Sequence, residues 1–340
     1  MSTPSIPTTM RALVLHAYDI GSYASLALEE RPVPRPGKGE ALVRVAAAPI
    51  NPSDLASLQG LYGVKKPLPV VPGIEASGTV VATGDGWLAR RLLGKRVACA
   101  AGGGDGTWAE YVVAPATQCS SLPASMDDEQ GAMRIVNPYT AWAHLSIASQ
   151  AHAHAIVQTA AASALGRMVI RLARRRGVAV INVVRRDEQM EALRGLGAEH
   201  ILNSEAPDFD QQLRALCRQL DARLAFDAVA GRMTARLLNA MAPGAKVVVY
   251  GGLASEPIQL NPGNIIFTQQ RIEGFYLSRW IAKQPPLSLI MMQRQLYGLG
   301  DVTHAAIQLR APLAEAQRAI AAYEANMSAG KVLFVPGRAD

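Results

Sequence analysis

Between residues 155 and 277, short apolar runs alternate with stretches of helical character, and this alternation constrains the fold more than any other feature of the chain. Strands that alternate with helices in this way predict an α/β fold with a doubly wound parallel sheet. Six strands are expected, at Ala155–Thr159, Val178–Val184, His200–Leu202, Leu224–Val229, Ala245–Gly251 and Arg271–Leu277. Helices are expected between them, at about Leu165–Arg176, Glu188–Leu196, Phe209–Leu220 and Thr234–Met241.

The first part of the chain has a different pattern. Up to about Val113, short β-branched runs are separated by Gly and Pro, which is typical of an irregular β domain in which turns dominate. Examples are Ala41–Ala46, Gly78–Ala82 and Arg96–Ala100. A helix is expected to begin within Asp127–Arg134, because acidic residues stand in its first turn.

The end of the chain returns to β character after a helical stretch that follows Pro285. We expect a strand at Ala305–Arg310, a helix at Leu313–Asn326 and a closing strand at Val332–Val335, which complete the first domain. The sequence therefore predicts an irregular β domain made of residues 10–130 and 304–336. Residues 131–303 are predicted to form the domain with the doubly wound sheet.

Composition excludes several classes of protein. The chain has 340 residues, 49% hydrophobic and 18% charged, which is enough for about two domains with buried cores. Its net charge of +7 is not concentrated in a basic tail, so we expect no nucleic-acid partner. No stretch reaches the roughly 20 apolar residues that a membrane span needs. Met1–Met10 lacks the basic and apolar parts of a secretory signal and is interpreted as a flexible lead-in.

The three cysteines, Cys99, Cys119 and Cys217, form no C-x-x-C pair and have no histidine at ligand spacing. A disulfide framework and a structural zinc site are therefore not expected. This cysteine content fits a protein of the reducing cytoplasm.

A candidate nucleotide site follows the strand at Ala155–Thr159. The next residues, Ala160–Gly166, are small and lead into a helix, so a pyrophosphate could meet helix N–H groups there. The G-x-G-x-x-G pattern would fall on Ala161, Ser163 and Gly166, so only one of its glycines is present. An ordinary tight strand–helix connection would look the same.

Two arginines, Arg185 and Arg186, favour a nucleotide-binding site. Arg185 and Arg186 end the next strand, about 20 residues after Gly166, where an NAD-specific fold would place an acidic residue on the ribose 2′-hydroxyl. A guanidinium can instead pair with a 2′-phosphate, which favours NADP. The alternative is a solvated strand end, and Asp187 complicates the phosphate interpretation.

Four segments match, in order, the landmarks of a known superfamily: Ala48–Asp54, Pro72–Gly78, Gly106–Tyr111 and Gly195–Ala198. On these residues the chain resembles the medium-chain dehydrogenase/reductase superfamily over nearly its full length. Members of this superfamily pair a GroES-like domain with a Rossmann domain. The resemblance implies that the irregular β domain is GroES-like and that the doubly wound sheet is a Rossmann domain.

The zinc-dependent alcohol dehydrogenases of that superfamily carry a metal-binding Cys in the first landmark and Gly-His-Glu in the second. Here the first landmark has no Cys, and Ile74 stands in place of the His. Zinc needs three or four protein ligands. The histidines offer no substitute cluster, since His152 and His154 are expected to face solvent. We therefore predict a member of the zinc-free branch that holds no metal.

Within that branch the chain most resembles the mitochondrial-type 2-enoyl thioester reductases, which reduce trans-2-enoyl-CoA or enoyl-ACP and are related to the quinone oxidoreductases. The segments that carry this resemblance are Ile50–Gly63 with its Gln-Gly-Leu-Tyr-Gly, Val136–Ala141, Ile181–Arg185, Tyr250–Leu253 and Gly274–Trp280. Quinone reductases usually lack the pair of Gln-Gly-x-Tyr-Gly and Gly-Phe-x-Leu-Ser-x-Trp motifs.

The resemblance implies roles for individual residues. Tyr62 corresponds to the catalytic tyrosine, and Trp280 lines the acyl pocket. The residues that would contact NADPH are Asn137, Ser163, Ala164, Leu165, Gly166, Arg185, Arg186, Asp187, Tyr250, Gly251, Gly252, Leu253, Phe275, Tyr276, Leu277 and Lys331. Two departures bear on the phosphate contacts: Ala164 replaces a glycine of the family, and Arg186-Asp187 reverses the family's Asp-Arg order.

The chemistry of this family explains why a tyrosine is needed. Hydride transfer to the β-carbon of a conjugated thioester leaves an enolate, so the site needs a donor near the thioester oxygen and a proton for the α-carbon. A tyrosine hydroxyl is protonated at neutral pH and can supply either. Without the resemblance, Tyr62 would be interpreted as a surface or packing residue, and Trp280 and Phe275 as interdomain packing.

Three functions remain open from the sequence. The first is an NADPH-dependent reductase of an activated C=C bond, with an enoyl thioester as substrate. The second is an NADPH:quinone oxidoreductase, which does not need the proton donor. The third is an NADP-binding protein without catalysis. The resemblance also implies a homodimer, in which the edge strand Arg271–Leu277 would pair with its copy.

Overall fold

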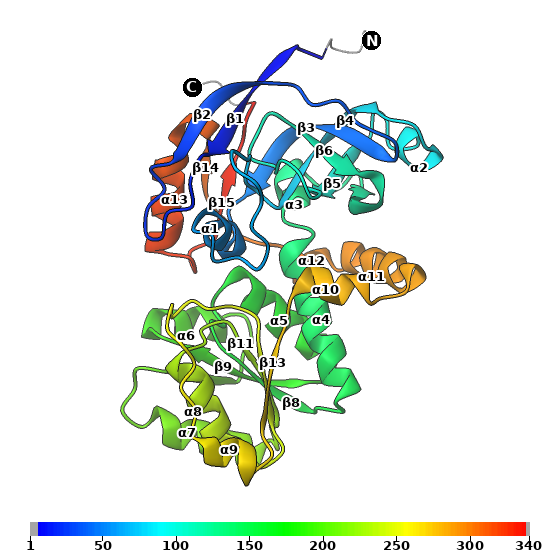
Figure 1. Ribbon diagram of the computed structural model, residues 1–340. Coiled ribbons are helices and arrows are strands. Elements are labelled where there is room, and N and C mark those ends of the chain that lie inside the picture. The colour runs from blue at the N-terminus through cyan, green and yellow to red at the C-terminus, as the bar shows by residue number, and fades with distance from the viewer. Residues whose placement is uncertain (1–5, 338–340) are drawn as a thin grey trace. The chain divides into compact units, whose positions relative to one another are not determined.

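The computed structural model describes residues 6–337, which fall into two compact units. Unit 1 takes the chain up to Val136 and again from Ala305, and unit 2 is Asn137–His304 (Figure 1). The first five residues of the predicted lead-in Met1–Met10 lie outside the described residues. Its last two belong to strand β1 (Thr9–Leu15), so the prediction of a flexible segment is wrong there.

The main sheet of unit 1 has seven strands and closes with the C-terminal part of the chain. Its strands are β3 (Glu40–Pro49), β4 (Glu75–Thr83), β5 (Arg96–Ala100), β6 (Tyr111–Pro115), β7 (Cys119–Ser121), β14 (Ile307–Ala311) and β15 (Lys331–Phe334). They follow the order β14–β15–β3–β4–β5–β7, with β6 paired to β3. A separate antiparallel pair consists of β1 and β2 (Leu26–Pro32). The predicted GroES-like β domain is confirmed.

The helices of unit 1 are short. They are α1 (Pro52–Leu58), α2 (Trp87–Arg90), α3 (Asp128–Ala132) and α13 (Ala316–Ala325), with 3-10 turns η1 (Ala116–Gln118) and η2 (Leu313–Glu315). The predicted helix Leu313–Asn326 is therefore a 3-10 turn followed by a shorter α-helix. The sequence prediction also missed α1, which begins with Pro52 at a position where a missing N–H costs nothing.

Strand β15 anchors the C-terminal segment in unit 1. It pairs antiparallel with β3, so that Phe334 lies opposite Ala48. The buried Phe334 ring meets the buried Trp108 ring edge-on at 4.9 Å between centroids. Trp108 Nε1 also donates to the carbonyl of Pro49 at 3.3 Å. These contacts fix the position of Lys331, the first residue of β15.

Unit 2 contains a six-stranded sheet in which every pairing is parallel. The strands are β8 (Ala155–Gln158), β9 (Ala179–Val184), β10 (His200–Asn203), β11 (Leu224–Asp227), β12 (Lys246–Val249) and β13 (Arg271–Gly274). Their order is β10–β9–β8–β11–β12–β13, the order of a Rossmann fold. The predicted α/β fold class is confirmed. The central strands β8 and β11 are fully buried, and each is apolar except for its last residue, Gln158 or Asp227.

Helices precede, connect and follow the strands of unit 2. They are α4 (Val136–Gln150), α5 (Ala164–Arg175), α6 (Asp187–Arg194), α7 (Phe209–Gln219), α8 (Arg232–Ala240), α9 (Pro262–Ile266), α10 (Leu277–Ala282), α11 (Pro286–Gly298) and α12 (Gly300–Thr303). The predicted strand Arg271–Leu277 is too long, because β13 ends at Gly274 and Leu277 begins α10. Within residues 6–337, no helix combines the length and the apolar character that crossing a membrane requires.

The structure brings two of the three cysteines together. Cys99 on β5 and Cys119 on β7 are register partners in the antiparallel sheet, although nothing in their sequence spacing indicates this. Both are free thiols. Burial raises the pKa of Cys119 to about 12 and raises that of Cys99 well above its ordinary value. Both thiols are therefore protonated at neutral pH and are poor nucleophiles.

Candidate active site

The connection from β8 to α5 is a tight turn with no room for a larger residue at its glycine. A Cβ on Gly166 would lie 2.3 Å from the carbonyl oxygen of Ala161. Ser163 caps the helix, since its Oγ accepts from the Gly166 N–H at 3.1 Å. Ala160 has a φ of 50°, in the left-handed region. The predicted residues Ser163–Gly166 therefore form the first turn of α5, whose N-terminus is suited to a phosphate.

Two buried amides, which the sequence analysis did not single out as functional, hold this turn to the sheet. Gln158, the last residue of β8, donates through Nε2 to the Gly166 carbonyl at 3.1 Å and to Asn182 Oδ1 at 2.8 Å. Asn182 on β9 donates in turn to the carbonyls of Val180 and His200. Both side chains are almost fully buried. Polar residues inside two apolar strands are the signal that could have revealed them.

Arg185 and Arg186 follow β9 and are exposed, as a site for an incoming phosphate requires. The backbone N–H of Arg185 donates to Gln189 Oε1 at 3.1 Å, which fixes the end of the strand. Asp187 begins α6, and its Oδ1 accepts from Asn203 Nδ2 at 2.9 Å. Its carboxylate is thus engaged with the end of β10.

An aromatic cluster surrounds His144 at the carboxyl ends of β11, β12 and β13. The imidazole stacks on Phe226 at 4.1 Å and meets Tyr250 edge-on at 4.6 Å and Phe275 at 5.3 Å, between centroids. Burial lowers the pKa of His144 to about 3, so the ring is neutral, and its Nε2 has no hydrogen-bond partner. The cluster brings together Tyr250 and Phe275, two of the residues predicted to contact the cofactor. The sequence analysis assigned no role to His144, two helical turns after Asn137 on α4.

The segment after β12 is bonded to the turn after β11. Leu253 N donates to the carbonyl of Ala228 at 3.1 Å, and Gly251 packs so closely that a Cβ there would lie 2.7 Å from the same oxygen. Burial, reinforced by the charge of Asp227, raises the pKa of Tyr250 above its ordinary value. The predicted residues Tyr250–Leu253 therefore have a fixed backbone.

The residues that follow β13 lead into α10. Phe275 N donates to the carbonyl of Val249, and Phe275, Tyr276 and Leu277 are half-buried. Trp280 lies in the middle of α10 and is also half-buried. Part of each side chain is thus accessible for contact with a ligand.

In unit 1, Tyr62 lies in a turn that depends on α1. The backbone N–H groups of Leu61 and Tyr62 both donate to the carbonyl of Ala56, at 2.8 and 3.1 Å. Gly60 has a φ of 68°, and a Cβ there would lie 3.0 Å from Tyr18 Cβ, so glycine is required in this turn. Tyr62 itself is half-buried. The backbone position of Tyr62 therefore follows the position of α1.

A buried charge network lies at the start of α1. Lys331 is 2% exposed, and its Nζ donates to the carbonyl of Ile50 at 3.1 Å and to Asn51 Oδ1. Asn51 Nδ2 donates to Glu75 Oε1 at 3.1 Å. Glu75 Oε2 accepts from the N–H groups of Ile135 and Val136 at 3.0 and 2.9 Å. Lys331, predicted to contact the cofactor, is thus placed inside unit 1, where its ammonium group already has partners.

Asp54 completes this network and is the least satisfied of its members. Its Oδ2 accepts from Asn51 N at 2.8 Å, whereas its buried Oδ1 has no partner. Burial raises the pKa of Asp54 from 3.8 to about 7, against the lowering effects of the Asn51 hydrogen bond and of Lys331. The sequence analysis left Asp54 and Glu75 unassigned. The structure shows that both hold the N-terminus of α1.

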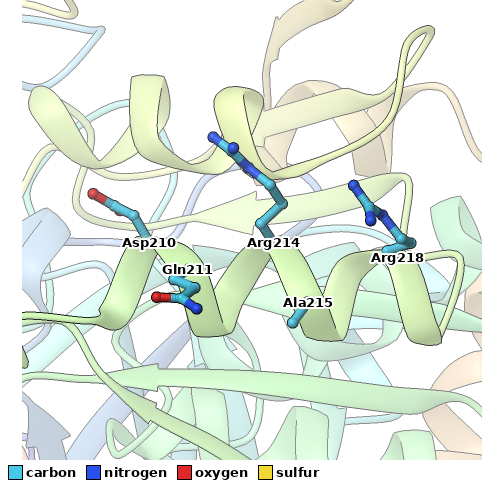
Figure 2. Close-up of a pocket in the computed structure, with 5 residues that line it drawn as sticks. All are labelled: Asp210, Gln211, Arg214, Ala215 and Arg218. Atoms are coloured by element: carbon cyan, nitrogen blue, oxygen red, sulfur yellow. The ribbon is translucent and has the colours of Figure 1, made fainter.

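Two surface hollows of the structure are lined by residues other than the predicted site residues. One of about 390 Å³ is lined by Asp210, Gln211, Arg214, Ala215 and Arg218 of α7 (Figure 2). Figure 2 shows Arg214 and Arg218 on neighbouring turns of the helix. Asp210 pairs with Arg236 at 2.6 Å. A second hollow of about 790 Å³ in unit 1 includes Arg44, Glu129 and Arg310. None of the lining residues was predicted to bind substrate or cofactor.

Potential metal ligands do not gather anywhere in residues 6–337: no group of three His, Cys, Asp or Glu side chains there could hold an ion. His152 and His154 are exposed, as predicted. The β8–α5 turn and the arginines after β9 do, by contrast, fit the phosphates of a dinucleotide. The fold and these residues define a dehydrogenase or reductase built from a GroES-like and a Rossmann unit.

Comparisons with known proteins agree with this class. Residues 37–124 match the family model of the alcohol dehydrogenase GroES-like domain, and residues 164–290 match that of the zinc-binding dehydrogenases. The mitochondrial enoyl-[acyl-carrier-protein] reductase of Bos taurus is 32% identical over 295 residues, covering 84% of this chain and 77% of that protein. The Homo sapiens protein of the same name is 31% identical over 330 residues, covering 94% and 87%.

Among solved structures, that of a "putative NADPH:quinone reductase" from Mesorhizobium loti has a TM-score of 0.90 and 37% identity, and covers 98% of this chain and 100% of that one. The chain therefore belongs to the medium-chain dehydrogenase/reductase superfamily, in its zinc-free branch, and is an oxidoreductase. The zinc in the name of one matching family model has no counterpart at Ile74, where the zinc-dependent members carry a histidine.

Asp54 gives a testable effect of pH on stability. Between about pH 4 and 7, Asp54 is protonated in the folded state and ionised in the unfolded state. Because the folded state binds the extra proton, the contribution of Asp54 to the free energy of unfolding falls as pH rises through that window. Asp54→Asn removes the titration and keeps an acceptor for Asn51 N. Relative to wild type, we expect the variant to gain up to about 4 kcal/mol between pH 4 and 7 and nothing further above pH 8.

Urea unfolding measured at intervals of one pH unit tests this expectation. Asp85→Asn, which changes an exposed carboxylate of the same unit, is the control and should leave the pH profile unchanged. A difference between Asp54→Asn and wild type that stays constant from pH 4 to 8 would show that Asp54 is ionised throughout.

Proposed function

We propose that this protein is a zinc-independent, NADPH-dependent reductase that transfers hydride to an activated C=C bond, with a trans-2-enoyl thioester as its substrate. The observation that carries the proposal is Tyr62 in its glycine-containing turn, on a chain of which 84% aligns with a protein named enoyl-[acyl-carrier-protein] reductase. The name of the Mesorhizobium loti structure supports NADPH as the hydride donor.

The bound cofactor would supply hydride to the β-carbon of the substrate. In unit 2, the first turn of α5 would bind the pyrophosphate, and Arg185 and Arg186 the 2′-phosphate. Tyr250–Leu253 and Phe275–Leu277 would contact the nicotinamide end, since their backbones are fixed at the carboxyl ends of β12 and β13. These roles rest on the resemblance and on the exposure and order of the residues.

Tyr62 would act on the thioester. Negative charge develops on the thioester oxygen when hydride arrives, and the hydroxyl of Tyr62 can donate a hydrogen bond to that oxygen or pass its proton to the α-carbon. The proton that completes the reduction comes from water through this hydroxyl. Trp280, half-buried on α10, would line the space for the acyl chain.

A second candidate function is NADPH:quinone reduction. The observation that favours it is the 37% identity and near-complete overlap with the Mesorhizobium loti structure. A quinone accepts hydride on an electron-poor ring and does not need a tyrosine to protonate carbon. The third possibility, an NADP-binding protein without catalysis, rests on the missing glycines of the phosphate turn. The cytoplasmic location stays a prediction from the cysteine content.

The role of Tyr62 separates the candidates. Removing its hydroxyl in Tyr62→Phe should lower the rate of NADPH oxidation with crotonyl-CoA by about 10²-fold or more, the scale of a lost proton or oxyanion donor. Turnover of a benzoquinone should change little. Tyr111→Phe, which removes the hydroxyl of another half-buried tyrosine of unit 1, should behave like wild type with both acceptors.

Absorbance at 340 nm follows both reactions. Turnover of the quinone alone, unaffected by Tyr62→Phe, would contradict the thioester proposal and support the second candidate. NADPH binding without turnover of either acceptor would support the third.

Cofactor choice depends on the exposed guanidinium of Arg185. We expect Arg185→Ala to weaken NADPH binding by about tenfold or more, because one charge-assisted hydrogen bond contributes roughly 1.5–3 kcal/mol, and to leave NADH binding unchanged. Arg214→Ala removes an exposed arginine from α7 and serves as the control. Fluorescence titration gives the six dissociation constants of the three proteins for the two cofactors, and an equal effect of Arg185→Ala on both cofactors would refute the 2′-phosphate contact.

We also propose a homodimer that pairs β13 with its copy, because β13 is an edge strand and apolar side chains at the end of the preceding helix α9 are exposed. Phe267 is 83% exposed and Ile266 65%. Light scattering should give twice the chain mass of 36.2 kDa for wild type and a single chain for Phe267→Glu. Trp87→Glu, at an exposed residue of unit 1, should remain dimeric. A single-chain mass for wild type would exclude this dimer.

A further inference from the structure

Asp227 is a buried carboxylate at the end of β11. It is fully buried, and its Oδ1 accepts from Thr159 Oγ at 2.8 Å and from Val229 N at 2.9 Å. Its Oδ2 accepts from Thr234 Oγ at 2.7 Å. Thr159 Oγ itself accepts from Ala228 N at 2.8 Å, so the hydrogen of its hydroxyl is free to point at Asp227. Both oxygens of Asp227 act as acceptors, which is the pattern of an ionised carboxylate.

Within residues 6–337, no cationic side chain forms an ion pair with this carboxylate. The three donors around it are neutral hydroxyl and amide groups. A buried charge without an opposite charge is costly to keep. Three hydrogen bonds stabilise the buried carboxylate but do not cancel its net charge, so this charge can act on a positive group bound nearby.

The position of Asp227 is where a Rossmann sheet binds its ligand. Strands β8 and β11 are neighbours, and the chain leaves them toward opposite ends of the sheet, β9 and β10 on one side and β12 and β13 on the other. Ligands bind outside the carboxyl ends of the strands at such a switch point. Thr159 follows β8 directly and Asp227 ends β11, so their hydrogen bond spans that point.

The backbone beside this hydrogen bond is strained. Ala160 and Ala230 follow the two strands and have φ values of 50° and 63°, a region that alanine rarely adopts. Local strain of this kind persists where the surroundings enforce it and is concentrated at functional sites. The hydrogen bonds from Thr159 and Val229 to Asp227 supply that enforcement.

The charge of Asp227 also reaches the residues proposed to contact the nicotinamide. It acts on the buried Tyr250, and the turn that Asp227 organises accepts hydrogen bonds from Leu253 N and Ala254 N. These residues belong to the segment after β12 that would hold the nicotinamide end of the cofactor. The nicotinamide ring is neutral in NADPH and carries a positive charge in NADP⁺.

We propose that the Asp227 carboxylate, held by Thr159, Thr234 and Val229 N, stabilises the positive charge that the nicotinamide ring acquires as hydride leaves, and so strengthens NADPH as a hydride donor. This inference rests on the proposed cofactor. Asp227 is a positioning and electrostatic residue here, since it is fully buried and both its oxygens are engaged by protein groups. The step itself balances as NADPH, enoyl thioester and a proton giving NADP⁺ and the saturated thioester.

The ratio of two dissociation constants tests this inference without any turnover. In Asp227→Asn, we expect NADP⁺ to bind about tenfold more weakly relative to NADPH than in wild type, which corresponds to a change of about 30 mV in the potential of the bound two-electron couple. Thr234→Val removes one hydrogen bond and keeps the charge, so the ratio should stay at the wild-type value even if both constants change. Asp227→Ser, a second neutral variant, is measured beside Asp227→Asn in case one of them does not fold.

Fluorescence and calorimetric titrations with NADPH and NADP⁺ give the ratio for each protein. An equal weakening of both ligands in the neutral variants would mean that Asp227 only supports the turn, and would overturn the inference. A ratio that changes as much in Thr234→Val as in Asp227→Asn would also overturn it. If the wild-type protein bound neither nucleotide, the proposed function would fail first, and this inference with it. Loss of thioester turnover with normal nucleotide binding would leave the inference standing.

Discussion

The burial of Lys331 is the constraint on which the catalytic half of the structure depends. Its ammonium group lies in the interior of unit 1, where it needs acceptors, and it finds them at Ile50 and Asn51 beside the carboxylate of Glu75. These contacts tie the C-terminal strand β15 to the start of α1. The turn that contains Tyr62 is hydrogen-bonded to α1. By holding α1, strand β15 therefore also holds the backbone of Tyr62, the residue proposed to protonate the substrate.

In unit 2, too, buried polar side chains hold the backbone of the candidate site. The Gln158–Asn182 pair fixes the first turn of α5, and the hydrogen bonds to Asp227 fix the turns after β8 and β11. Apolar packing alone could not select these turn conformations, because a turn presents little apolar surface. Buried polar groups that are fully satisfied specify geometry, since each allows only a few arrangements of its partners. Both units thus place their functional backbone with polar contacts from the core.

The sequence predicted the Rossmann sheet well because its buried parallel strands are short and mostly apolar, as Ala155–Val157 and Val247–Val249 show. It predicted α1 and the end of β13 poorly, since a seven-residue helix has too few turns for a periodic pattern and Gly274 gives no clear stop signal. Strand pairing brings Cys99 next to Cys119. A hydrogen bond between residues far apart in the sequence joins Asp227 to Thr159. Single-sequence patterns do not contain such contacts.

The missing glycines of the phosphate turn now have a physical explanation. Ser163 has a φ of −65°, Ala161 has no positive φ, and Ala164 is the first residue of α5, so none of these positions requires a glycine by conformation. Gly166 is retained because the carbonyl of Ala161 leaves no space for a Cβ. Ala160 adopts a left-handed conformation that a glycine would adopt more easily, and Asp227, through Thr159, holds the adjoining residue in place. The altered motif therefore gives no conformational reason to doubt that the turn binds a dinucleotide. The strained residue of the turn, Ala160, follows Thr159, which is bonded to Asp227, the carboxylate proposed to promote hydride transfer.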